Sequence, residues 1–128
     1  MEKGLVVCDT NVFIEFYKNN PEVVGKLQKI GSDNIALSVV TAAELFYGAL
    51  NKKELFHLKE DLDSLRMIEL NKNISTLFID LLLKYSLSHN LDLPDALIAA
   101  TAIHHNYFIR LTQKILGILI LYCFGNHR

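Results

Sequence analysis

The feature that most constrains the fold of this chain is the alternation of short apolar segments with longer segments of helical periodicity. The short segments are predicted to be strands, and they comprise residues 5–8, 35–40, 67–70 and 107–111. The first of them, LVVC, is continuously apolar, which is typical of a strand buried on both faces of a sheet. Strands that alternate with helices predict an α/β fold with a small parallel sheet covered by helices. In such a sheet, ligands bind beyond the carboxyl ends of the strands.

The segments between these strands are predicted to be helices, and two of them have clear signals at their ends. The predicted helices comprise residues 12–17, 21–30, 41–50, 52–65, 74–85 and 94–102. Asn20 before Pro21 is typical of an N-cap followed by a first-turn proline, and Gly31 is expected to end that helix. Asp92 is the predicted N-cap of the last helix.

Length and composition indicate one domain without a membrane-spanning segment. The chain has 128 residues, of which 51% are hydrophobic, so we expect residues 1–128 to form a single domain with a sizeable core. The net charge of -1 argues against a generally basic nucleic-acid-binding surface, but not against a local site. No apolar run has the roughly 18 residues of a membrane span, and no signal peptide is evident. The two cysteines, Cys8 and Cys123, form no disulfide framework or zinc motif, so a cytoplasmic location is expected.

Three acidic residues follow predicted strands or begin predicted helices. Asp9 comes directly after the first strand, and Glu44 is expected in the first turn of the helix after the second strand. Asp95 follows Pro94 at the start of a later helix. Because helices that follow parallel strands begin at the same edge of the sheet, we expect the three carboxylates to converge there.

Each of these acids also has a structural explanation that involves no ligand. Asp9 is suited to cap the helix that follows it, and Thr41 with Glu44 matches the capping box. Asp95 lies where the helix macrodipole favours a negative charge. The functional interpretation is favoured by the residues around the acids. Thr10 and Asn11 add small polar groups beside Asp9, and small alanines allow close approach of helix backbones: Ala42, Ala43, Ala96, Ala99 and Ala100.

Clustered carboxylates predict a bound cation. Without one, the negative charges repel each other and one carboxylate takes up a proton. Mg²⁺ and Mn²⁺ prefer oxygen ligands, and a bound ion of this kind polarises a phosphoryl oxygen and makes a coordinated water more acidic. We therefore infer metal-assisted hydrolysis of a phosphodiester as the reaction class.

Three segments of the sequence resemble the main motifs of a known family. DTNVFIEFY, VVTAAELFYGAL and LPDALIAATAIHHN are similar, in this order, to the motifs of PIN domains, and most of all to those of VapC toxins of toxin–antitoxin pairs. The resemblance covers roughly residues 5 to 112. Any one of the motifs alone is weak evidence, but the three together at domain-scale spacing are specific.

The resemblance implies both a fold and an activity. The fold would be a three-layer α/β/α arrangement, and the activity that of a Mg²⁺- or Mn²⁺-dependent endoribonuclease acting on RNA. Asp9, Glu44 and Asp95 would take the places of the metal-binding acids, and Thr112 the place of a hydroxyl residue near the site. The partners would be a VapB-type antitoxin, whose tail crosses the active-site groove, and a second copy of the chain in a homodimer.

The C-terminal segment departs from the family pattern. After Thr112 the family usually supplies a fourth acid, but here Lys114 and Gly117 stand near the expected asparagine and aspartate, and no Asp or Glu follows Asp95. Residues 113–128 are atypical also because 115–124 are almost wholly apolar. Two interpretations stay open: a buried edge strand, or the product of a truncation or reading-frame shift, since one codon choice for LYCFGNHR read two bases later gives VLFRESP.

The missing acid leaves competing hypotheses for the function. One is an active ribonuclease, and another is a PIN-like module that binds an antitoxin without cutting RNA. A phosphatase-like hydrolase with Asp9 as nucleophile is disfavoured, because Asn11 stands where such an enzyme needs a second aspartate. Other side chains have both a functional and a structural explanation. The histidines suit a metal site or general base, or the end of a helix: His89, His104 and His105. The basic residues suit RNA contact or a solvent-exposed helix face: Lys52, Lys53, Lys59 and Arg66. The aromatic residues suit antitoxin contact or the core: Phe13, Phe16, Phe46 and Tyr47.

Overall fold

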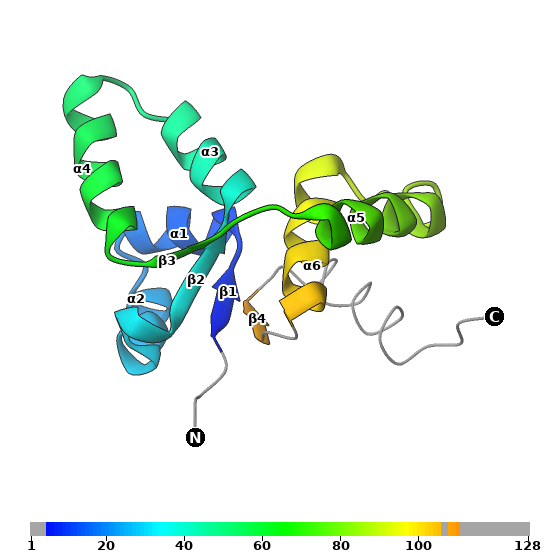
Figure 1. The fold of residues 1–128 in the computed structure, drawn as a ribbon. Helices are drawn as coiled ribbons and strands as arrows, with labels where there is room; N and C mark the ends of the chain where they lie inside the picture. The colour runs from blue at the N-terminus through cyan, green and yellow to red at the C-terminus, as the bar shows by residue number, and fades with distance from the viewer. Residues whose placement is uncertain (1–4, 106–107, 111–128) are drawn as a thin grey trace.

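Helices and strands alternate along the chain, as the sequence predicts (Figure 1). The computed structural model describes residues 5–105 and 108–110. In chain order the elements are β1 (Val6–Cys8), α1 (Thr10–Tyr17), α2 (Pro21–Ile30), η1 (Ser32–Asn34), β2 (Ile35–Ser38), α3 (Val39–Tyr47), α4 (Lys52–Asp63), β3 (Arg66–Ile68), α5 (Lys72–Tyr85), α6 (Leu93–His105) and β4 (Phe108–Arg110).

The strands form one parallel sheet in the order β3-β2-β1-β4. From β1 the chain proceeds outward to β2 and β3, and it returns to place β4 on the other side of β1, where Val6 pairs with Phe108. The strand order therefore reverses at β1. In open parallel sheets, the crevice beyond the carboxyl ends of the strands at such a reversal is the usual ligand site.

The sheet is covered on both faces, which gives the predicted three-layer α/β/α fold. On one face, Cys8, Ile35 and Leu37 pack with α1, α2 and α4 in a single core cluster. On the other face, Val7 and Ala36 pack with α6. Alternate residues of the same strand thus point to opposite layers, and both sets are apolar because both faces are buried.

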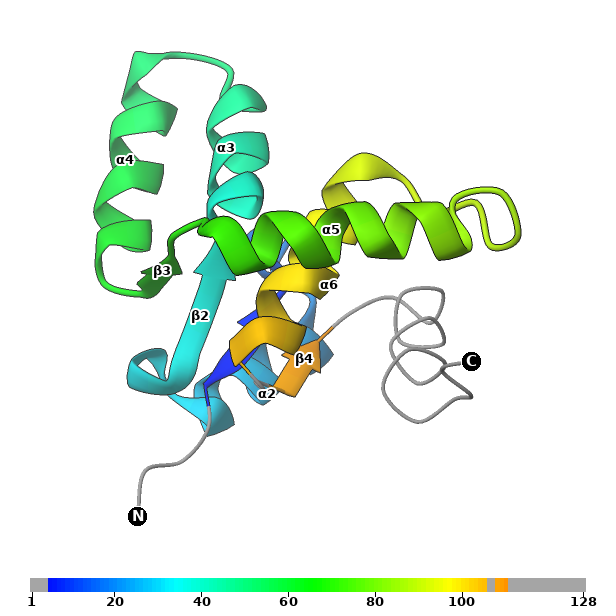
Figure 2. The same cartoon turned by 45° about the vertical axis from the view of Figure 1, so that its right-hand side comes forward.

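Helix α5 packs against α6, and the two helices cross beside the sheet (Figures 1 and 2). The side of α6 that faces α5 is formed by Ala96, Ala99 and Ala100, all completely buried. Small side chains at this spacing allow the two helix backbones to approach closely. Residues on other sides of α6, including Ile98 and Thr101, are buried as well, so this helix is buried on most of its surface.

Most predicted helix ends are confirmed. Asn20 caps α2 with Pro21 in the first turn, and Gly31 ends it with a φ of 84°, in the left-handed region that glycine favours. Asp92 caps α6, because its Oδ1 accepts a hydrogen bond from the Asp95 backbone N–H at 3.0 Å. Asp9 caps α1, although this helix begins at Thr10 and not at residue 12.

The predicted capping box at Thr41 is wrong. The strand β2 ends at Ser38, and α3 begins at Val39. Ser38 is the N-cap and accepts a hydrogen bond from the Thr41 backbone N–H at 3.2 Å. Glu44 therefore lies in the second turn of α3, not in the first, and it has no capping role.

The remaining predictions about chain organisation concern membranes and the C-terminus. Within residues 5–105 and 108–110, no helix has both the length and the apolar character needed to cross a bilayer. The atypical segment 113–128 and Thr112 lie outside the described residues.

Candidate active site

Asp9 is the residue that joins β1 to α1, at the strand where the sheet order reverses. Its side chain is only 3% exposed, although it is charged in its ordinary state. One carboxylate oxygen, Oδ1, accepts a hydrogen bond from the Val12 backbone N–H at 3.0 Å, so the structural explanation for this acid holds. A carboxylate has about four acceptor positions on two oxygens. Capping α1 is therefore compatible with a second role for the same carboxylate.

Glu44 is held beside the residue that follows Asp9. The Thr10 hydroxyl donates a hydrogen bond to Glu44 Oε1 at 2.6 Å, although the two residues are 34 positions apart in the sequence. This distance is typical of a hydroxyl that donates to an ionised carboxylate, which is stronger than a neutral hydrogen bond. Since Glu44 is not part of a capping box, its one structural explanation is gone. A tertiary hydrogen bond to the neighbour of Asp9 takes its place.

Asp95 is half-buried in the first turn of α6. This end of α6 lies on the side of the sheet where β1 and β2 end (Figures 1 and 2). Among residues 5–105 and 108–110, however, no three His, Cys, Asp or Glu side chains lie close enough together to hold one metal ion. The structure thus brings Glu44 to Thr10, next to Asp9, and does not gather all three acids into one ligand set. Their joint role stays a prediction.

A cavity of about 460 Å³ opens beside the Thr10–Glu44 hydrogen bond. We call it the site cavity. Its walls come from α1, α3 and α4, and its lining residues are Thr10, Ile14, Tyr17, Lys18, Glu44, Leu45, Gly48, Ala49, Glu54, His57, Leu58 and Asp61. The basic side chains of the lining stand on two walls, Lys18 at the end of α1 and His57 on α4. The cavity therefore places both acidic and basic groups around Glu44.

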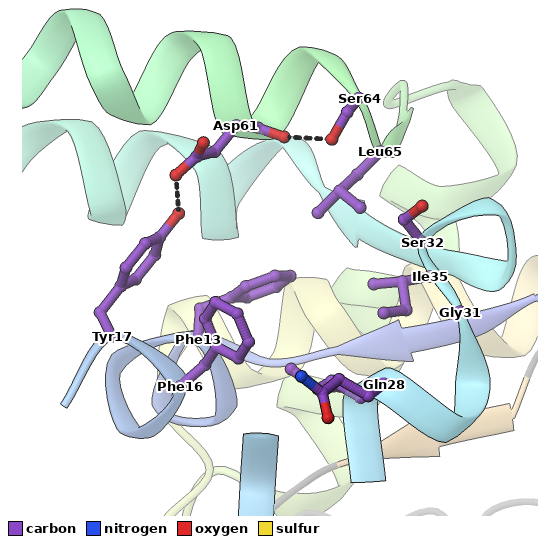
Figure 3. Close-up of a pocket in the computed structure, with 11 residues that line it drawn as sticks. Phe13, Phe16, Tyr17, Gln28, Gly31, Ser32, Ile35, Asp61, Ser64 and Leu65 are labelled. Carbon is purple, nitrogen blue, oxygen red and sulfur yellow. Dashed lines mark hydrogen bonds between the residues drawn. The ribbon is translucent and has the colours of Figure 1, made fainter. Parts of the chain in front are cut away.

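A second cavity, of about 390 Å³, shares Tyr17 and Asp61 with the site cavity (Figure 3). We call it the apolar cavity, because its lining includes Phe13, Phe16 and Ile35. Tyr17 and Asp61 line both cavities, and the Tyr17 hydroxyl donates a hydrogen bond to Asp61 Oδ2 at 3.0 Å. Burial of the ring, this hydrogen bond and the Asp61 charge raise the pKa of the Tyr17 phenol well above its ordinary value of 10.0.

The histidines of the sequence prediction lie away from the site. His104 and His105 end α6 just before β4 begins, at the opposite end of this helix from Asp95. Their rings contact each other edge-to-face with centroids 4.8 Å apart. Burial, and secondarily the nearby His104, lower the pKa of the His105 imidazole below its ordinary value. His89 is exposed and contacts Ser88 and Tyr85.

The predicted RNA-steering and partner-binding side chains divide into exposed and buried groups. Lys59 forms an ion pair with Asp63 at 2.6 Å on the exposed face of α4, which agrees with a solvent-exposed role. Phe13 is buried and Phe16 is half-buried, whereas Tyr47 is 94% exposed. Partner contact by these aromatic residues stays a prediction. The other predicted RNA-steering residues are exposed as well, namely Lys52, Lys53 and Arg66.

The residues at the site fit a hard divalent cation by their chemistry. Every candidate donor is an oxygen, from a carboxylate or a hydroxyl, and no thiolate or imidazole is among them. Mg²⁺ usually keeps several waters and needs only one or two carboxylates from the protein. Asp9, buried at the end of β1, and Glu44, fixed by Thr10, are carboxylates of the type that such binding uses.

Together, the strand order, the helix layers and the acids beyond β1 define an α/β protein with a candidate acidic site at the reversal of the sheet. A model of the PIN domain family matches residues 6–109. The chain belongs to the PIN domain family, as its three motifs indicated. No protein of curated function matches the sequence.

Solved structures with the same fold support this assignment. A chain of a toxin–antitoxin complex from Klebsiella pneumoniae is 27% identical and has a TM-score of 0.75, with 88% of this chain and 92% of that chain covered. A chain of FitAcB from Neisseria gonorrhoeae is 26% identical, with a TM-score of 0.72 and coverage of 89% and 93%. A chain of VapBC2 from Rickettsia felis, solved with a promoter DNA fragment, shares the fold at 24% identity and a TM-score of 0.71, with coverage of 89% and 92%.

Proposed function

We propose that this chain is the toxin of a toxin–antitoxin pair and that it is a divalent-metal-dependent endoribonuclease, which hydrolyses phosphodiester bonds of RNA. The observation that carries the proposal is the 2.6 Å hydrogen bond from Thr10 to Glu44, which holds a second carboxylate beside the residue that follows the buried Asp9 in the sequence. Membership of the PIN domain family and similarity to a chain of a toxin–antitoxin complex support it.

In this proposal, Asp9, Glu44 and Asp95 would hold Mg²⁺ or Mn²⁺, directly or through water. When bound, such an ion supplies a Lewis acid for a phosphoryl oxygen and a more acidic water. The chain itself orients the carboxylates. The Val12 N–H donates a hydrogen bond to one oxygen of Asp9, and the Thr10 hydroxyl donates one to an oxygen of Glu44. Carboxylates that are already oriented lose little freedom during the reaction. Thr112, outside the described residues, is expected to orient the site further.

The proposed protein partner is a VapB-type antitoxin that covers the site. The apolar cavity lies next to the site cavity and is lined by Phe13 and Phe16, so it suits an apolar side chain of such a partner. We also propose that the toxin forms a homodimer, as the resemblance to VapC toxins implies, and that it acts in the cytoplasm.

The direct test is cleavage of RNA by the purified, antitoxin-free chain. We expect cleavage with millimolar Mg²⁺ or Mn²⁺, loss of cleavage with excess EDTA, and recovery when the metal is restored in excess of the chelator. Electrophoresis of a labelled RNA gives the measurement, and an equivalent DNA strand is the comparison. Cleavage that is as fast in EDTA as in Mg²⁺ would refute the proposed metal-dependent reaction.

A second candidate function is an antitoxin-binding module that does not cut RNA. The absence of any Asp or Glu after Asp95 favours this candidate, because one acid of the family pattern is missing. Calorimetric titration with Mn²⁺ separates the two functions. Heat of binding that disappears in Asp9→Asn supports the ribonuclease, whereas no binding at millimolar Mn²⁺ supports the module.

Thr10→Val is expected to lower the rate of RNA cleavage by about tenfold, because valine has the same shape but cannot donate a hydrogen bond. A lost charge-assisted hydrogen bond is worth about 1.5–3 kcal/mol when it is fully realised, and Glu44 is only partly buried. The measurement is the single-turnover rate at saturating Mn²⁺. Thr10→Ser retains the donor and is the matched control. Equal rates for the valine and serine variants would exclude a role for this hydroxyl.

A further inference from the structure

The hydrogen bond between Tyr17 and Asp61 joins two walls of the site cavity. Tyr17 is the last residue of α1, and Asp61 is in the last turn of α4, 44 positions further along the chain. Figure 3 shows the Tyr17 hydroxyl directed at the Asp61 carboxylate across the gap between these helices. The Tyr17 ring also contacts Phe16 edge-to-face, with centroids 5.5 Å apart, so the phenol leaves α1 in a fixed direction.

The helix α4 has few other attachments along its first half. Residues 52–57 are all exposed, and Leu62 is the buried residue of the helix. The apolar core therefore holds the end of α4, whereas the first half forms a wall of the site cavity with little burial behind it. The hydrogen bond from Tyr17 reaches α4 at Asp61, next to the buried Leu62, and joins this end of the helix to α1.

The basic groups of the site cavity lie on the two walls that the Tyr17–Asp61 hydrogen bond joins, α1 and α4. Lys18 directly follows Tyr17 at the end of α1, and His57 lies one helical turn before Asp61 on α4. Three acids line the same cavity: Glu44 accepts a hydrogen bond from Thr10, Asp61 accepts one from Tyr17, and Glu54 is the third. His57 Nδ1 also lies 3.8 Å from Glu60 Oε1. Lys18 and His57 are therefore the basic side chains of the lining that a phosphate group in this cavity could contact.

We propose that Tyr17 and Asp61 are positioning residues of the site, whose hydrogen bond fixes the distance between Lys18 and His57 so that they bind the phosphates of an RNA strand beside Glu44. The proposal rests on the proposed function for its substrate, and it adds the residues that hold that substrate. Tyr17 and Asp61 act through the position of α4 and do not touch the reacting atoms.

The test measures RNA binding separately from cleavage. The probe is a fluorescent RNA oligonucleotide, and binding is followed by anisotropy at low salt in EDTA, which prevents the proposed metal-dependent cleavage of the probe. We expect Tyr17→Phe, Asp61→Ala and His57→Ala each to weaken binding by about fivefold, the effect of one lost hydrogen bond or contact. Asp61→Asn is expected to bind like the natural chain, because its amide oxygen still accepts the hydrogen bond from Tyr17.

The comparison of the two Asp61 variants separates the effect of the Tyr17–Asp61 hydrogen bond from the effect of the Asp61 charge. Both variants remove the same negative charge, so simple electrostatics predicts the same change in both. The double variant Tyr17→Phe/His57→Ala is expected to bind no more weakly than His57→Ala, because Tyr17 acts through His57. Equal binding by Asp61→Asn and Asp61→Ala, or independent losses that multiply in the double variant, would overturn the proposal. Absence of RNA binding by the natural chain would overturn it too, whereas binding without cleavage counts only against the proposed enzymatic function.

Two measurements without RNA test the Tyr17–Asp61 hydrogen bond itself. Hydrogen–deuterium exchange in α4 is expected to be faster in Tyr17→Phe and Asp61→Ala than in Asp61→Asn, with α5 unchanged as the internal reference. In an alkaline absorbance titration, Tyr17 is expected to ionise above its ordinary pKa of 10.0, and Tyr17→Phe removes this late step. The sign follows from the raised pKa: the folded state retains the phenol proton, so stability falls as the pH rises above about 10. Exchange in α4 that is the same in all variants, or the absence of a late ionisation step that depends on Tyr17, would contradict a role for this hydrogen bond.

Discussion

Replacement of Asp9 by Asn is expected to lower RNA cleavage by at least about 100-fold without unfolding the chain. Asn is as good an N-cap as Asp, so its side-chain oxygen still accepts the hydrogen bond from the Val12 N–H. The substitution removes only the negative charge, at a position that is 3% exposed. Loss of one preorganised group that stabilises charge in a transition state typically costs about 100- to 1,000-fold in rate, and Asp9 would contribute such stabilisation by holding the metal ion. The measurement is the single-turnover rate of cleavage in Mn²⁺.

Two further variants show whether the effect of Asp9→Asn comes from chemistry. Asp9→Ala removes the cap as well, so its free energy of unfolding is expected to fall by about 1 kcal/mol below that of Asp9→Asn. Asp33→Asn removes one negative charge from the exposed helix η1, which contributes no residue to the site cavity, and its rate is expected to be unchanged. If Asp9→Asn retains a third of the natural rate, Asp9 is a cap and no more.

Leu37→Ala is expected to destabilise the folded chain by about 2–5 kcal/mol, the usual cost of truncating a buried leucine. Leu37 is in β2, a strand with neighbours on both sides, and its side chain is completely buried in the cluster with α1, α2 and α4. Layers on both faces and strands on both sides leave little freedom for the structure to fill the resulting cavity. Urea denaturation gives the change in the free energy of unfolding.

The matched control for Leu37→Ala is Leu50→Ala, which makes the same chemical change at a side chain that is 86% exposed. Its free energy of unfolding is expected to change by less than about 0.5 kcal/mol. If both variants lose the same amount of stability, β2 is not at the centre of the core. Loss of less than about 1 kcal/mol by Leu37→Ala would contradict the described packing.

The fold could be predicted from the sequence because its signals are local. The apolar segment at Val6–Cys8, the proline after Asn20 and the glycine at position 31 each determine the structure of their own neighbourhood. The junction between β2 and α3 could not be predicted correctly. Ser38 and Thr41 are both plausible caps, and Val39 between them is β-branched, so the sequence extends the strand while the structure begins the helix.

The candidate site could be predicted only in part, because its decisive contacts are tertiary. The sequence identifies Asp9 and Glu44 as candidates, and it identifies Thr10 as a small polar neighbour. It gives no sign that Thr10 donates a hydrogen bond to Glu44. The same holds for Tyr17 and Asp61, since their hydrogen bond depends on how α4 packs beside α1. Periodicity reports which side of a helix is buried, but not which helix lies opposite it.

The pairing of β1 with β4 has a consequence for the synthesis of the chain. Residues 6–8 leave the ribosome before the other strands of the sheet, but residues 108–110, which pair with one side of that strand, leave it only after β2 and β3. Until then, one edge of β1 is open to pairing with other nascent or misfolded polypeptides. Contacts between such distant segments also form slowly. Folding is therefore expected to finish late in translation, and premature termination before residue 108 would release a product prone to aggregate.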